Sequence, residues 1–114
     1  MGLQLFVRHV ADIVIIDLHG KATIGAANDI LRNQLRQLIE DGSSKVLINL
    51  TDVTQLDSSS IGTIVSALTS LQRRGANLKL LRPRGNVRLV LEMARLLDLI
   101  PCIEDESEAI ASFN

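Results

Sequence analysis

The sequences KVLINL at residues 45–50 and DSSSIG at residues 57–62 decide the fold of this chain. The first is a continuous aliphatic run, which is typical of a strand buried on both faces of a parallel sheet. The second opens a stretch whose apolar residues recur at the spacing of one helical face: Ile61, Ile64, Val65, Leu68 and Leu71. We therefore predict a buried strand, a connector that ends at Leu56, and a helix that begins at the serines and ends near Arg74.

Asp57, Ser58, Ser59 and Ser60 would lie at the start of that helix, where the first backbone N–H groups have no partner within the helix. An Asp or Ser side chain there is a good N-terminal cap. A phosphate there would meet free N–H donors and the positive end of the helix dipole. On the local sequence alone, both uses fit these four residues.

Composition excludes several classes of function. The 12 basic and 13 acidic residues nearly cancel, and only Phe6 and Phe113 carry large aromatic rings, so neither a basic surface nor a stacking platform for nucleic acid is indicated. Cys102 is the single cysteine, which excludes an internal disulfide, and we interpret it as a small buried apolar residue. No apolar run approaches the ~20 residues of a membrane helix. We expect a soluble, cytoplasmic protein that binds neither nucleic acid nor membrane and needs no cofactor.

The sequence also lacks motifs for catalysis or metal binding. His9 and His19 both fall in the first predicted hairpin, and no further His or Cys stands at metal-binding spacing. The serines have no flanking glycines of the kind found at a nucleophile elbow, and no phosphate-binding GxxxxGK motif occurs. We therefore predict that the protein is not an enzyme and has no metal site.

The remaining elements follow from periodicity and turn residues. Ala11 and Asp12 suit a tight hairpin turn, Gly42 and Gly75 suit helix ends, and the acidic residues 105–108 suit a first helical turn. The predicted elements are strands at 3–10 and 13–19, a loop at 20–25, a helix at 26–40, the strand at 45–50, the serine helix, a strand at 77–81, a helix at 87–97, an extended segment at 98–103 and a last short helix.

Alternation of strands and helices requires parallel pairing with right-handed crossovers. We predict one α/β domain over residues 1–114, with a mixed four- to five-stranded sheet, an N-terminal β-hairpin, parallel βαβ units and about four helices.

The same patterns assign side chains to faces. The inner face of the hairpin would hold Leu5, Val7, Val14, Ile16 and Leu18. Its outer face would be a mixed surface, available for a homodimer, with Gln4, Phe6, Arg8, Ile15, Asp17 and His19. The first helix would bury Ala27, Leu31, Leu35 and Leu38. The third would turn inward Val87, Val90, Leu91, Ala94 and Leu97.

Two stretches of the central region, VLINLTDV at residues 46–53 and LDSSSIG at residues 56–62, carry a resemblance to a known family. They resemble the signature of the STAS domain, and more narrowly that of the bacterial anti-sigma factor antagonists. The resemblance extends to LHG at residues 18–20, to Gly75 and to LKLL at residues 78–81, so it covers nearly the whole chain. Its most specific part is the Asp-Ser-Ser core followed by Ile-Gly.

The resemblance implies a partner switch. In that family a serine kinase, which is also the anti-sigma factor, phosphorylates the Ser or Thr directly after the motif aspartate, here Ser58. The unmodified antagonist binds the anti-sigma factor and frees the sigma factor, the phosphorylated form is released, and a metal-dependent serine phosphatase resets it. ATP and magnesium belong to those partners. The implied contact residues are Thr23, Asp57, Ser58, Ser59, Ser60 and Gly62.

Two departures from the family pattern leave alternatives open. Many members have Gly where this chain has Ser60, so Ser59 and Ser60 remain candidate acceptors beside Ser58. Many carry an acidic residue in the loop after the second strand, where this chain has Lys21 and Thr23, which points to a different partner or orientation. The alternative function is that of members that act without phosphorylation, as subunits or scaffolds of transport, lipid-handling or stress-sensing complexes.

Overall fold

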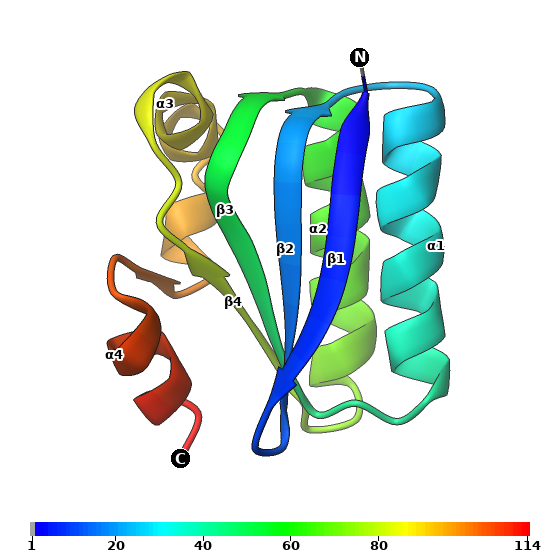
Figure 1. The fold of residues 1–114 in the computed structure, drawn as a ribbon, viewed down its shortest axis with the longest axis vertical. Helices are drawn as coiled ribbons and strands as arrows, with labels where there is room; N and C mark the ends of the chain where they lie inside the picture. Colours follow the sequence, from blue (N-terminus) through cyan, green and yellow to red (C-terminus); the bar gives the residue numbers. More distant parts are fainter. Residues whose placement is uncertain (1) are drawn as a thin grey trace.

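The computed structural model describes residues 2–114, which form one five-stranded sheet covered by helices on both faces (Figure 1). The strand order is β1-β2-β3-β4-β5. The strands are β1 (Leu3–Val10), β2 (Ile13–Ala22), β3 (Lys45–Leu56), β4 (Asn77–Leu81) and β5 (Cys102–Ile103). The helices are α1 (Ala26–Glu40), α2 (Ser58–Gln72), α3 (Gly85–Met93) and α4 (Glu106–Ala111), with a 3-10 turn at Leu96–Asp98.

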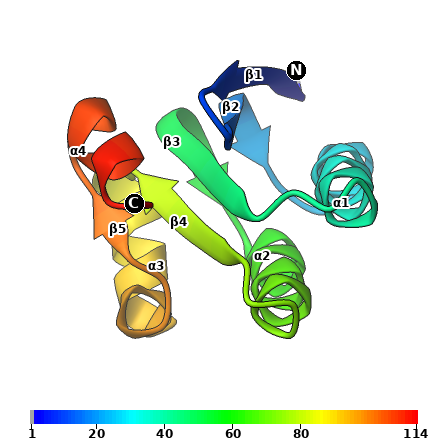
Figure 2. The ribbon, with the colours of Figure 1, turned by 90° about the horizontal axis from the view of Figure 1, so that it is seen from below.

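The predicted fold class is confirmed. β1 and β2 pair antiparallel across the two-residue turn, and every other neighbouring pair of strands is parallel. Figure 2 shows α1, α2 and α3 on one face of the sheet and α4 on the other. The short fifth strand precedes the last helix, as the extended segment near Cys102 indicated.

Aliphatic side chains fill the space between the sheet and the three larger helices. The predicted stripe of α1 is confirmed, because its four residues are all buried: Ala27, Leu31, Leu35 and Leu38. β3 is buried on both faces, as the run at residues 46–48 predicted. The helix after the serines buries Ile64, Leu68 and Leu71 against it.

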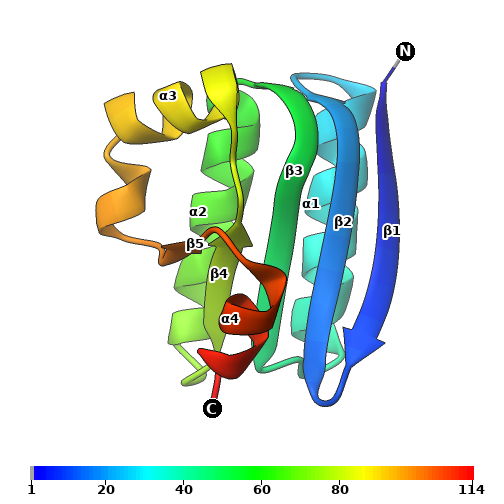
Figure 3. The same cartoon turned by 60° about the vertical axis from the view of Figure 1, so that its left-hand side comes forward.

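The outer face of the sheet is more apolar than we predicted. Ile15 was placed on a mixed surface, but it is fully buried in a second cluster with Ile13 and Leu47. Ile15 is buried because α4 lies across this part of the sheet and contributes Ala109 and Phe113 to the cluster (Figure 3).

Two strands are longer than predicted. Residues 20–22 of the expected loop and the whole connector at 51–56 instead extend β2 and β3, which stay paired from His19 with Asp52 to Ala22 with Leu56. The register shifts twice along this extension, and Gly20 sits there with a φ of 105°. Such irregular pairing has no simple alternation in sequence, which is why periodicity missed it.

The third helix is shorter than predicted. It ends at Met93, and Arg95 adopts a left-handed φ of 58° before the 3-10 turn. Ala94, which was expected to face inward, is exposed, because the change of direction at Arg95 presents Leu96 and Ile100 to the core instead.

Candidate functional site

The extended ends of β2 and β3 bring the β2–α1 loop against the serine motif. Ala22 pairs with Leu56, so the next residues of each strand leave the sheet side by side. The backbone N–H of Asp57 donates to the carbonyl of Ala22 at 3.3 Å. The motif is thus held between two elements that lie about 35 residues apart in sequence.

Asp57 is the N-cap of α2 and also ties the helix to the loop. Its Oδ1 accepts from the Ser60 N–H at 3.1 Å and from the Ser59 hydroxyl at 2.6 Å, and its Oδ2 accepts from the Ile24 N–H at 2.8 Å. Desolvation opposes ionisation, but these hydrogen bonds outweigh it and hold the pKa of Asp57 below its usual range. Asp57 is therefore a fixed negative charge beside Ser58 at neutral pH.

The three serines have different surroundings. Ser60 is fully buried, and its hydroxyl donates to the Ala22 carbonyl at 2.7 Å. Ser59 is half-buried and its hydroxyl donates to Asp57. Ser58 is exposed, and its hydroxyl makes no hydrogen bond to any residue in the range 2–114. Of the three candidate acceptors, Ser58 alone presents a free hydroxyl, and the burial of Ser60 weighs against that residue.

The other predicted contact residues, Thr23 and Gly62, belong to the β2–α1 loop and to α2. Thr23 is half-buried, and its carbonyl accepts from the Asn28 N–H at 3.1 Å. Gly62 is exposed on α2, where an added Cβ would meet nothing within 4 Å. Sequence reasoning missed Ile24, which is 78% exposed beside Asp57. The signal for it was an aliphatic residue next to Gly25 in a loop.

A groove of about 820 Å³ begins at Ser59 and runs between α1 and α2. Its α2 wall consists of small residues such as Gly62, Ser66 and Ala67, and its α1 wall includes Arg32 and Arg36. The short side chains of α2 leave room there, so the surface beside Ser58 is recessed on one side.

Comparison with known proteins identifies the family of this chain. The STAS domain family matches residues 4–109. The chain belongs to the STAS domain family. A protein of Thermotoga neapolitana assigned as an anti-sigma factor antagonist is 30% identical over 101 residues, which are 89% of each chain. Anti-sigma factor antagonists of this family are regulators rather than enzymes.

Solved structures share the STAS fold. The crystal structure of an anti-sigma factor antagonist assigned in Thermotoga maritima has a TM-score of 0.89 at 25% identity, covering 96% of this chain and 93% of that one. The Bacillus cell fate determinant SpoIIAA in its phosphorylated form has a TM-score of 0.77 at 22% identity, covering 97% of this chain and 100% of that one. The second likeness shows the fold alone.

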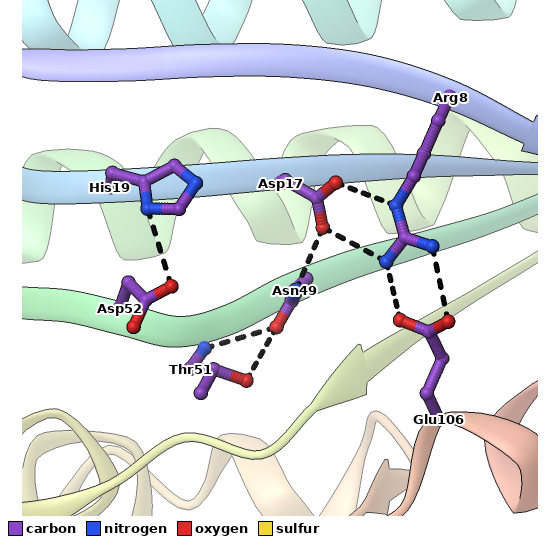
Figure 4. Close-up of polar contacts among 7 residues, drawn as sticks. All are labelled: Arg8, Asp17, His19, Asn49, Thr51, Asp52 and Glu106. Atoms are coloured by element: carbon purple, nitrogen blue, oxygen red, sulfur yellow. Dashed lines mark hydrogen bonds and ion pairs between the residues drawn. The ribbon is translucent and has the colours of Figure 1, made fainter.

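A second polar cluster lies on the outer face of the STAS sheet (Figure 4). The Arg8 guanidinium donates to Asp17 at 2.6 Å and also binds Glu106, the first residue of α4. Asn49 donates to Asp17 at 2.7 Å. The hydrogen bonds from Arg8 lower the pKa of Glu106. This cluster fastens α4 to the sheet, a link that sequence reasoning did not make because it joins residues about 100 positions apart.

His19 and Cys102, which could take part in catalysis or metal binding, are not gathered into a site within residues 2–114. His19 Nδ1 lies 3.2 Å from Asp52, and its ring packs edge-on against Phe6. Cys102 is half-buried rather than fully buried, and burial raises the pKa of its thiol. Within residues 2–114, no group of three or more His, Cys, Asp or Glu residues is placed to hold a metal ion. Over the same range, none of the helices combines the length and the apolar character needed to cross a membrane.

Proposed function

We propose that this STAS domain, residues 1–114, is a cytoplasmic anti-sigma factor antagonist whose binding is switched by phosphorylation of Ser58. The unmodified protein binds an anti-sigma factor that is also a serine kinase, and the sigma factor is released. Phosphorylation of Ser58 ends that complex, and a serine phosphatase restores the binding form.

One observation carries the proposal. Ser58 holds the one free hydroxyl among the three serines, at the first position of a helix whose cap is already formed by Asp57. A kinase can therefore reach it without breaking a hydrogen bond. The relatives assigned as anti-sigma factor antagonists support the assignment of the partner, and the phosphorylated SpoIIAA structure shows that a protein of this fold can carry such a group.

Phosphorylation is expected to change the stability of the fold much less than the stability of the complex. A phosphate adds about −1.5 to −2 charge at neutral pH. At a helix start this charge gains about 0.3–1 kcal/mol from the dipole, so the fold tolerates it. In a complex the same charge must be desolvated beside the ionised Asp57, and a loss of about 3 kcal/mol weakens binding roughly a hundredfold.

The surface around Ser58 supplies the contacts that a partner needs. Ile24 presents an exposed apolar side chain in the loop that is tied to Asp57, and Ser59 and Gly62 line the start of the groove. An exposed apolar side chain gives a partner an apolar contact, and the groove gives it a recess in which an anchoring side chain can pack. Ser58 adjoins Asp57 and Ser59 at this helix start, where an added phosphate would meet the partner directly.

Binding to the anti-sigma factor kinase of the same organism tests the proposal. We expect Ser58→Asp to weaken the affinity about a hundredfold. We expect Ser58→Ala to bind as tightly as the unmodified wild type and, unlike the wild type, to stay bound when ATP is added. Isothermal titration would measure both affinities.

Ser107→Asp is the matched control, because Ser107 is an exposed serine in the first turn of another capped helix, α4. It should leave the affinity unchanged. If Ser58→Asp bound as tightly as the wild type, the electrostatic account of the switch would be wrong.

A further inference from the structure

The two edges of the sheet are protected differently. Exposed strand edges attract other strands, and proteins usually guard them with short strands, prolines, bulges, free charges or a covering element. β5 is only two residues long, whereas β1 has eight residues without proline and pairs with β2 without a register shift. No other element within residues 2–114 lies beyond β1 at that end of the sheet (Figure 2).

The side chains of β1 do not guard the edge either. Its single arginine, Arg8, is held by Asp17 and Glu106 on the outer face, so its charge is already paired. Of the exposed large apolar side chains in residues 2–114, the two that belong to the sheet are both in β1: Phe6, which is 55% exposed, and Val7, which is 37% exposed. The edge is therefore apolar and open.

The backbone of β1 shows which groups are free. In a hairpin with a two-residue turn, the residues that flank the turn form a hydrogen-bonded pair, here Val10 with Ile13. Because this pattern alternates, the even-numbered residues of β1 direct their backbone groups to β2. The odd-numbered residues from Leu3 to His9 direct their N–H and C=O groups to the free edge.

We propose that β1 pairs antiparallel with β1 of a second copy of this chain, about a two-fold axis at Phe6. In this register Phe6 lies opposite Phe6 of the second copy, Leu5 lies opposite Val7, and Gln4 lies opposite Arg8. At the centre of this register apolar residues meet apolar residues, Leu3 lies opposite His9 toward the ends, and no like charges face each other. The two sheets become one continuous sheet through an isologous interface.

A neighbouring register is less favourable. An axis at Val7 also matches the free backbone groups of both copies. It would place Phe6 opposite Arg8, however, and Leu5 opposite His9, and it would keep one apolar pair, Val7 opposite Val7. The axis at Phe6 is therefore the one that the side chains select.

Sedimentation equilibrium of the purified full chain tests the pairing. We expect the average mass to rise from 12.5 kDa toward twice that value as the concentration increases from about 10 μM to about 1 mM. Val7→Pro should remain monomeric, because it removes a free-edge N–H while leaving the hydrogen bonds to β2 in place. A wild type that stays monomeric throughout would overturn the proposal.

Charge variants at Phe6 test the register and do not depend on proline. Phe6→Glu alone and Phe6→Lys alone should be monomeric, and an equal mixture of the two should recover the dimer. Leu89→Glu is the matched control, since Leu89 is 52% exposed on α3, and it should dimerise as the wild type does. A dimer that persists in Phe6→Glu, or a mixture that stays monomeric, would overturn the Phe6 axis. Ser58→Asp should dimerise as the wild type does, so the dimer can be tested independently of the phosphorylation switch.

Discussion

α2 and α4 begin with the same kind of cap but differ in the charge of their first turns. Asp57 accepts from the Ser60 N–H, and Asp105 accepts from the Glu108 N–H, each at 3.1 Å. The first turn of α2 contains no acidic residue, whereas that of α4 contains Glu106 and Glu108. The first turn of α4 thus already carries negative charge, whereas α2 has none there beyond its cap residue, Asp57.

The start of α4 holds the structure together, whereas the start of α2 is free to accept a phosphate. In α4 the first residue is used for docking, because Glu106 binds Arg8 on β1. In α2 the first residue, Ser58, is exposed and makes no contact that fixes its hydroxyl, while the cap residue Asp57 ties the helix to the β2–α1 loop. A group that is to gain and lose a phosphate needs this division of roles, since the fold must not depend on it.

The largest effect is expected at the third position of α2. Ser60→Asp would bury a carboxylate where Ser60 is fully buried, and we expect a loss of about 3–5 kcal/mol in the free energy of unfolding. Ser58→Asp should change it by less than about 1 kcal/mol. Urea denaturation would measure both. Equal losses for the two variants would show that position 58 is not independent of the fold.

A smaller effect is expected at the caps. Asp57→Ala removes the cap, the Ser59 contact and the link to Ile24, and we expect a loss of about 2 kcal/mol. Asp105→Ala removes an exposed local cap and should cost about 0.5–1 kcal/mol. Thermal melting of the two variants compares them directly. If Asp105→Ala were the more destabilising variant, the hydrogen bond between Asp57 and the β2–α1 loop would contribute nothing to stability.

The smallest effect is expected where α4 meets the sheet. Glu106→Gln should cost no more than about 1 kcal/mol, because the ion pair with Arg8 is partly exposed and screened. The folded-state pKa of Glu106 is lowered, so its contribution is fully present above the unfolded pKa of about 4.3 and is lost as the pH falls through the folded value. Denaturation at several pH values should show wild type and Glu106→Gln converging in acid. If the difference in the free energy of unfolding between the two proteins stayed constant down to about pH 2, the ion pair with Arg8 would not be its cause.

Much of the fold could be predicted, because most elements have regular periodicity. The bounds of β1, β4 and α1 agree with the predicted ranges, and each has a clear turn residue or apolar pattern. The errors fall where tertiary contacts override local pattern. The extended end of β3 is stabilised by its irregular pairing with β2, and Ile15 is buried by an α4 that lies about 90 residues further along the chain.

The site was predictable in composition but not in arrangement. The motif identified Asp57 and the three serines, since Asp and Ser are good caps. No sequence pattern distinguished the hydroxyl of Ser60, which is buried against Ala22, from that of Ser58, which is free. That distinction depends on how β2 ends beside β3, and only the folded chain shows it.

Mapping the phosphate by mass spectrometry tests the central claim most directly. The full chain would be incubated with ATP and the anti-sigma factor kinase of its own organism, beside the Ser58→Ala variant. We predict one phosphate on the wild type, located on Ser58, and none on Ser58→Ala. A phosphate on Ser59 or Ser60, or a wild type that acquires none, would contradict the account.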